Sequence, residues 1–196
     1  MYSMPVVGVA LRPATKLKSL DSAKSRLSLG KFEIERYMLA VRDFVRTYSP
    51  EAESQVAFAW NGKHADEFID TNMQFRREVC DFFQDDKRAF SLPLIAALFK
   101  AETLFAKEAW GVNRVVSGLA EELLERGGIE YLDLYLAGAR CGMDAYLETG
   151  NITLSEPRCQ ELLDQCKANA NVANGSEKQW ALLAERFAFL LTKKSP

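Results

Sequence analysis

The sequence is poor in the residues and motifs on which most catalytic and cofactor sites depend. It has one histidine, His64, in 196 residues, and its four cysteines are dispersed without any Cys-x-x-Cys pair. It also lacks a Gly-x-Ser-x-Gly segment and a glycine-rich phosphate loop of the Gly-x-x-x-x-Gly-Lys or Gly-x-Gly-x-x-Gly type. Zinc sites, histidine-dependent hydrolases and nucleotide loops each need one of these patterns. We therefore predict no catalytic residues, no metal site and no cofactor.

Long apolar runs are also missing. No uninterrupted run approaches the roughly 18 residues that a membrane-spanning helix needs, and the first residues, MYSMPVVGVALRP, do not have the layout of a signal peptide. The cysteines fall inside helical patterns, and Cys159 and Cys166 would lie about 10 Å apart along one helix, too far for a disulfide. We expect a cytoplasmic protein with free thiols and no membrane segment.

Helical periodicity is what the sequence does contain. Apolar residues recur at steps of three and four along most of the chain, which predicts an all-α fold, either a compact helical bundle or a short helical stack of about seven or eight helices. Residues 1–196 are predicted to form one domain, in which residues 1–30 are either a weak helix or a loosely ordered basic arm. The predicted helices cover residues 31–48, 63–84, 91–110, 112–126, 129–149, 155–167 and 176–194.

The helices at 112–126 and 129–149 are predicted to form the centre of the fold. Leu123 and Leu136 are expected in the seam between them, and the steps of three and four extend this seam over six positions: Ile129, Leu132, Leu136, Ala139, Met143 and Tyr146. Gly138 and Gly142 each cost a helix roughly 1 kcal/mol relative to alanine. We therefore expect another helix to approach them closely.

Charge is distributed unevenly along the chain, although the net charge is only −2. Residues 1–46 carry nine Lys and Arg against four Asp and Glu, whereas residues 121–148 carry seven acidic residues against two arginines. These are either two solvated faces that partly pair, or an acidic recognition surface and a basic arm. For the second case the predicted partner-binding residues are Glu122, Glu125, Glu130, Asp133, Arg140, Asp144 and Glu148.

The preferred hypothesis is a non-catalytic cytoplasmic protein that acts by binding another protein. Small acidic helical proteins that inhibit or neutralise a basic toxin or enzyme are the analogy, so the expected partner is a basic protein. The alternative is a small-molecule-binding protein or an enzyme with a pocket between helices, lined by Tyr131, Tyr135 and Tyr146. Nucleic-acid binding through the basic segment is disfavoured by a pI near 5.6. The sequence does not indicate an oligomeric state.

Overall fold

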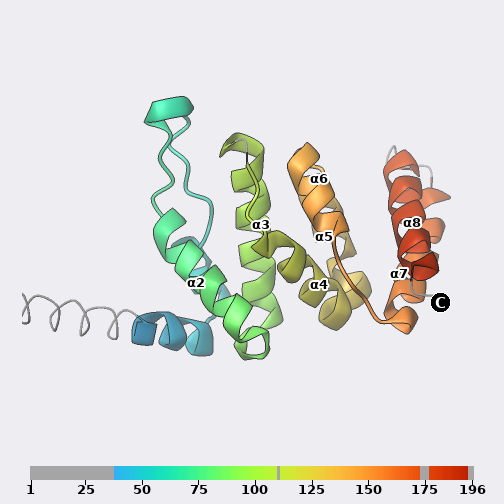
Figure 1. Ribbon diagram of the computed structural model, residues 1–196, viewed down its shortest axis with the longest axis horizontal. Helices are drawn as coiled ribbons and strands as arrows, with labels where there is room; N and C mark the ends of the chain where they lie inside the picture. Colours follow the sequence, from blue (N-terminus) through green and yellow to red (C-terminus); the bar gives the residue numbers. More distant parts are fainter. Residues whose placement is uncertain (1–37, 110, 173–176, 194–196) are drawn as a thin grey trace, which may run out of the picture. The chain divides into compact units, whose positions relative to one another are not determined.

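Nearly all regular structure in the described residues is helical. The computed structural model describes residues 38–109, 111–172 and 177–193. Internal packing divides the chain into residues 1–39 and 40–196, and the second unit begins with a helical stretch at 40–47. Seven labelled helices follow (Figure 1): α2 Met73–Asp85, α3 Leu92–Ala109, α4 Val115–Gly127, α5 Leu132–Ala139, α6 Met143–Gly150, α7 Glu156–Ala170 and α8 Glu177–Thr192. The predicted all-α class and number of helices are confirmed.

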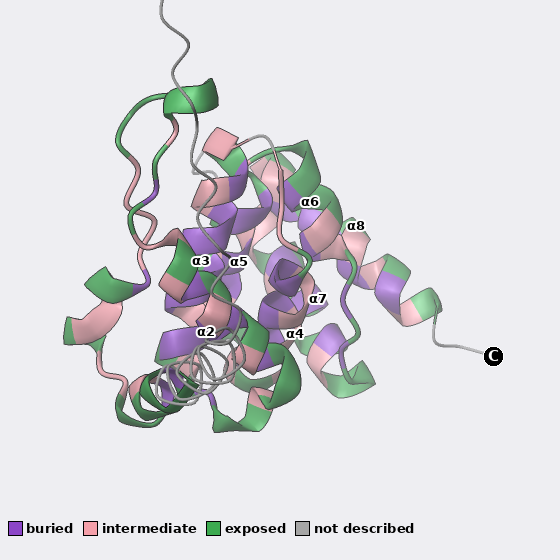
Figure 2. Cartoon of the chain, turned by 60° about the vertical axis from the view of Figure 1, so that its left-hand side comes forward, coloured by how far each residue is buried: buried purple, intermediate pink, exposed green. Residues whose placement is uncertain are grey.

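The most enclosed helix is α3, which precedes the pair predicted to be central. Half of its residues are buried, Leu98 and Phe99 fully so, and α4, α5 and α6 all pack against it. Figure 2 shows buried residues concentrated where these helices meet. Leu123 of α4 is fully buried as predicted, whereas Leu136 of α5 is only partly buried at the edge of the core. The centre of the fold is therefore shared by α3 and α4.

The last two helices form an antiparallel pair. Ser155 precedes α7 as its N-cap residue and Pro157 lies in the first turn, where its missing N–H leaves no intrahelical bond unmade. The buried face of α7 includes Cys159 and Cys166, and that of α8 includes Phe187, as the sequence pattern predicted. The Cys159 thiol donates to the Phe187 carbonyl oxygen across the pair, at 3.3 Å.

The helix predicted at residues 63–84 begins ten residues later than expected. Residues 57–71, which we call the finger, instead run out and back as two extended segments around a short 3-10 turn at Ala65–Glu67 (Figure 1). An isolated antiparallel bridge joins Trp60 to Asp70. The Asn61 amide group accepts from the N–H groups of Lys63 and Ile69 and donates to the Glu67 carbonyl, which holds the tip. The turn at Asn61-Gly62 therefore belongs to a hairpin-like loop.

A buried cluster of charges fixes the base of the finger. The guanidinium of Arg76 donates through Nη2 to Asp70 Oδ2 and through Nε to Glu102 Oε1, both at 2.6 Å. All three side chains are shielded from solvent. Asp70 also accepts from the backbone N–H groups of Ala59 and Asn72, at 3.1 and 3.2 Å. Arg76 on α2 thus connects the finger to α3. The free energy gained by pairing this buried charge outweighs the tendency of the preceding residues to form the helix that their apolar spacing predicts.

The helix predicted at residues 129–149 is broken into three pieces. A 3-10 turn at Gly128–Tyr131 leads into α5, and α6 begins only after the break at residues 140–142. Gly138 does meet another helix closely, because a Cβ there would lie 2.5 Å from Phe99 Cε1 of α3. A Cβ at Gly142 would meet nothing within 4 Å. The close approach expected at two glycines is therefore correct for Gly138 and wrong for Gly142.

The break also changes which side chains are buried. Three positions assigned to the seam are exposed, with accessible fractions of 40% for Ile129, 73% for Met143 and 42% for Tyr146. Tyr135, which lies outside the predicted seam, is fully buried instead. None of the helices in the described ranges has the length and apolarity needed to span a membrane. The predicted arm at residues 1–30 lies outside the described residues, so the single-domain assignment stays a prediction.

Candidate functional site

Part of the predicted acidic set serves to hold the fold together. Glu125 accepts hydrogen bonds from the backbone N–H and the hydroxyl of Ser155, at 2.8 and 2.6 Å. Its carboxylate thereby covers the N-terminus of α7, where negative charge is favourable. Glu122 forms an ion pair with Arg126 on the next turn of α4, at 3.7 Å. These two carboxylates already have partners inside the molecule.

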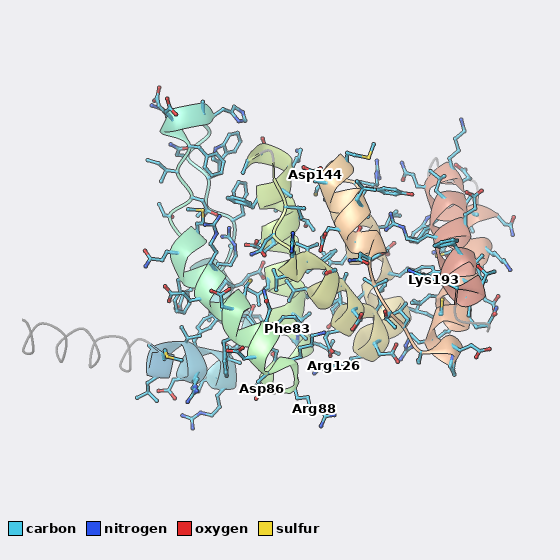
Figure 3. The ribbon with its side chains drawn as sticks, in the orientation of Figure 1. Phe83, Asp86, Arg88, Arg126, Asp144 and Lys193 are labelled. Carbon is cyan, nitrogen blue, oxygen red and sulfur yellow. The ribbon has the colours of Figure 1, made fainter. Side chains whose placement is uncertain are left out.

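Of the five remaining residues of the predicted set, one has a hydrogen-bond partner in the described residues and four have none. Arg140 donates to the side-chain oxygen of Gln179 on α8, at 2.9 Å. Four carboxylates make no hydrogen bond or ion pair with any described residue: Glu130, Asp133, Asp144 and Glu148. They do not form one stripe, because the first two lie in the 3-10 turn and α5, and the last two lie in α6. Figure 3 places Asp144 at the end of α6 remote from Arg126.

A groove runs between α6 and α8. Its volume is about 330 Å³, and eight residues line this α6–α8 groove: Tyr146, Leu147, Gly150, Leu182, Glu185, Arg186, Phe189 and Leu190. Large apolar side chains on both walls are exposed to solvent, with fractions of 62% for Leu147, 55% for Leu182 and 64% for Phe189. Exposed apolar residues gathered in one place, rather than scattered singly, mark a binding surface.

A second, smaller cavity continues the groove along α8. It has a volume of about 70 Å³ and shares Tyr146, Leu182 and Arg186 with the larger one. Its other lining residues come from α5, the break after it and α8: Leu136, Ala139, Arg140, Gln179 and Leu183. The depression is therefore continuous over several turns of α8 and has two distinct compartments.

Arg186 lies between the two compartments and is fixed by several contacts. Its Nη1 donates to the hydroxyls of Tyr135 and Thr149, at 2.8 and 3.2 Å, and its Nη2 donates to the Tyr146 carbonyl at 2.9 Å. The Tyr146 ring stacks on the guanidinium with 4.1 Å between the guanidinium carbon and the ring centroid. The positive charge is thus directed to the C-terminal turn of α6, where helix carbonyls favour it. Arg186 joins α8 to α6 beneath the groove.

The three tyrosines proposed for a small-molecule pocket occupy different surroundings. Tyr146 lines the groove. Tyr135 is fully buried, and its hydroxyl donates to the Thr149 carbonyl at 2.8 Å. Burial raises the pKa of the Tyr135 hydroxyl, although the charge of Arg186 opposes that shift, so Tyr135 is a neutral structural group. Tyr131 packs its ring against Gly127, where it would touch an added Cβ.

Residues suited to metal binding or covalent catalysis do not converge in the described ranges. No group of three or more His, Cys, Asp or Glu side chains there is placed to hold a metal ion. His64 lies at the tip of the finger with its ring 4.8 Å from that of Trp60. Burial raises the pKa of the Cys80 thiol well above its ordinary value and that of Cys166 to about 12. These buried cysteines are therefore thiols rather than nucleophilic thiolates at neutral pH.

Comparison with known proteins adds no assignment to this geometry, because no protein family, curated protein or solved structure matches the chain.

The α8 wall of the groove was missed by the sequence reasoning. Leu182 and Phe189 are seven residues apart and lie off the apolar face that α8 buries against the core. A second apolar stripe on a helix whose first stripe already faces the core is the signal that could have revealed it.

Proposed function

We propose that this chain is a non-catalytic cytoplasmic protein that binds a basic protein partner, as an inhibitor or immunity-type binder does. One observation carries the proposal: an exposed apolar groove has a carboxylate without a described partner on its wall, and two further such carboxylates lie on one of its helices outside the lining. Glu185 lies on the groove wall, and Asp144 and Glu148 lie on α6, which supplies the opposite wall. Such a surface combines a charged border with an apolar centre, as protein interfaces do.

The two kinds of residue make different contributions to binding. Charges within the ~8 Å screening length of physiological salt attract a basic partner and raise its association rate. Burial of the groove side chains supplies free energy at about 25 cal/mol per Å² of apolar surface removed from water. Unpaired like charges also repel one another, so a basic partner would relieve repulsion that the unbound protein carries.

Identification of the partner is the first step of the test. The full chain serves as bait in its native cell, and proteins retained by it are identified by mass spectrometry and purified. Association of the purified partner is then followed by surface plasmon resonance at low and physiological salt. The decisive variant is Asp144→Lys with Glu185→Lys. The matched control reverses Asp81 and Asp85, two exposed acids on α2, and changes the net charge by the same amount.

Reversal of Asp144 and Glu185 should slow association about tenfold at low salt and flatten the salt dependence, because steering acts mainly on the association rate. The α2 control should change the rate far less. A partner that associates with the groove variant at the wild-type rate would contradict the proposal and leave these acids as a solvated face.

The other two open acids of the predicted set allow a graded test. Glu130 and Asp133 lie outside the groove lining, in the 3-10 turn and at the start of α5. Reversal of both should lower the association rate less than reversal at the groove, without changing the dissociation rate, because they act only through their field. A larger effect on dissociation here than at the groove would place the contact surface on α5 instead.

A further inference from the structure

We infer that the α6–α8 groove binds a second copy of this chain, with the α8 helices of the two copies crossing in an antiparallel, two-fold symmetric arrangement. The inference concerns the oligomeric state of the protein and goes beyond the proposed function, so it does not depend on the identity of the partner. It starts from two charged groups on α8 that a single chain leaves incompletely bonded.

The groove contains a carboxylate and a guanidinium that cannot pair within one chain. Glu185 makes no hydrogen bond or ion pair with any described residue. Arg186 donates three hydrogen bonds, so two of its five N–H groups have no acceptor in the described part of the chain. Adjacent residues of a helix point in different directions, and Glu185 therefore does not face Arg186. A second copy related by a two-fold axis would supply each group with the other.

The exposed apolar residues of α8 fit the same symmetry. Leu182 and Phe189 are two turns apart, about 10 Å along the axis, and Glu185 and Arg186 lie midway between them. If the two-fold axis passes through this midpoint, Leu182 lies opposite Phe189 of the second copy, and Glu185 lies opposite Arg186 of the second copy. Each contact then occurs twice, once on either side of the axis. The exposed face of α8 is thus complementary to itself in the reversed direction.

The rest of the lining also suits a surface of the same composition. Tyr146 and Leu147 of α6 supply an apolar wall beside α8. The groove and its continuing cavity together contain one carboxylate, that of Glu185, and two guanidinium groups, those of Arg186 and Arg140. Because the lining holds both signs of charge around apolar side chains, the α8 of a second copy meets it with matching apolar and opposite-charge contacts.

Like charges of α8 lie only at the ends of this crossing. Lys178 and Lys193 are exposed, and each is about 11 Å along the axis from the midpoint. Helices that cross at about 50°, the commonest packing angle, have diverged at that distance. These lysines therefore stay in water, where salt screens their repulsion.

The exposed apolar surface of the groove is large enough for a weak dimer. Four of its side chains are 42–64% accessible: Tyr146, Leu147, Leu182 and Phe189. With about 60–120 Å² for a whole leucine side chain and about 150–250 Å² for an aromatic one, they expose roughly 200–400 Å² per copy. Since about 60% of an interface is non-polar, a dimer that covers this surface would bury around 1,000 Å² in total. That area is at the lower limit for specific interfaces and predicts a dimer that dissociates readily.

Such a dimer would regulate access to the groove. The second copy and the basic partner would use the same surface, so the dimer has to dissociate before the partner binds. This consequence alone rests on the proposed function.

Sedimentation velocity of the full chain, from about 1 µM to about 1 mM, spans the affinities of weak interfaces. The wild type should shift from the 22.1 kDa monomer to a dimer over this range. Leu182→Ser with Phe189→Ser should weaken the dimer about tenfold or more. The matched control is Ile129→Ser with Val172→Ser, which removes exposed apolar groups outside the groove lining and should leave the dimer affinity within about twofold.

A charge substitution tests the register of the crossing. Glu185→Arg places like charges opposite Arg186 of the second copy and should weaken the dimer about tenfold at low salt, whereas Glu185→Gln, which keeps an acceptor, should weaken it less. The matched control is Asp81→Arg, which reverses an exposed acid on α2 with the same change in net charge. It should change the dimer affinity by less than about twofold. All the substituted side chains are exposed, and wild-type circular dichroism of each variant checks the fold.

Three results would overturn the inference: a monomer over the whole concentration range, a dimer that the Leu182 and Phe189 variant leaves intact, or a dimer that Glu185→Arg does not weaken. Association of the captured basic partner is measured below the concentration at which the wild type dimerises, so the two hypotheses fail separately. A monomeric chain whose partner is slowed by reversal of Asp144 and Glu185 would refute the dimer and leave the proposed function standing. A groove-dependent dimer whose partner ignores that reversal would do the opposite.

Discussion

The clearest test of the fold is removal of the buried cation at the base of the finger, by Arg76→Met. The side chains of Arg76 and Asp70 are fully shielded, and that of Glu102 is 2% exposed. One positive charge therefore balances two buried carboxylates. Methionine keeps much of the volume of arginine but supplies neither charge nor hydrogen-bond donors.

The expected cost follows from the groups left behind. Removal of one partner from a buried ion pair typically costs 3–5 kcal/mol, because an uncompensated charge remains. Asp70 would still accept from the N–H groups of Ala59 and Asn72, which limits its share of the cost. Glu102 would lose the 2.6 Å hydrogen bond from Arg76 Nε, which is its one bond to a described residue. We therefore expect a loss of about 3–5 kcal/mol, with Glu102 contributing the larger part.

Urea denaturation followed by circular dichroism measures this loss. The matched control is the adjacent Arg77→Met, because Arg77 is exposed and its described contact is with the face of the Phe105 ring, at 5.7 Å. The control should cost less than about 1 kcal/mol. Hydrogen exchange of the Asn61 and Thr71 amides, which bond across the finger, should accelerate in the Arg76 variant. A loss below about 1 kcal/mol for Arg76→Met would refute the argument that this charge cluster holds the finger.

Three further predictions concern the core and the thiols. Leu123→Ala should lower the free energy of unfolding by about 2–5 kcal/mol, and Leu136→Ala should lower it by less because Leu136 is only partly buried. Equal losses in urea titrations would contradict the burial pattern. Gly138→Ala should destabilise by up to about 2 kcal/mol net, because overpacking costs about 1–3 kcal/mol and the helix gain is roughly 1 kcal/mol. A variant with a higher melting temperature would show the α3–α5 contact to be looser. At pH 8 a thiol reagent should modify the half-buried Cys141 first and Cys166 only after unfolding. The raised pKa of about 12 leaves the Cys166 thiol protonated until the pH approaches that value. Equal labelling rates of the two cysteines in the native protein would contradict this prediction.

The candidate site was only partly accessible from the sequence. Charge counting found Asp144 and Glu148, which the structure leaves open, but it could not distinguish them from Glu125, whose carboxylate holds Ser155. That difference depends on a residue 30 positions along the chain, and no local pattern reports it. The apolar half of the groove was missed because Leu182 and Phe189 were judged against one helix face only.

Local sequence determined the helical class, the α7 and α8 faces and the burial of Leu123, because a repeating apolar spacing of three and four is itself the geometry of a helix side. Tertiary structure decided where two helices stop. Arg76 requires two carboxylates from other elements, so residues before α2 form the finger, although their apolar spacing is helical. Gly138 fits against Phe99 of α3, and the chain breaks soon after it. Both outcomes depend on burying charge and volume against distant residues, and those free energies are set only once the helices have packed.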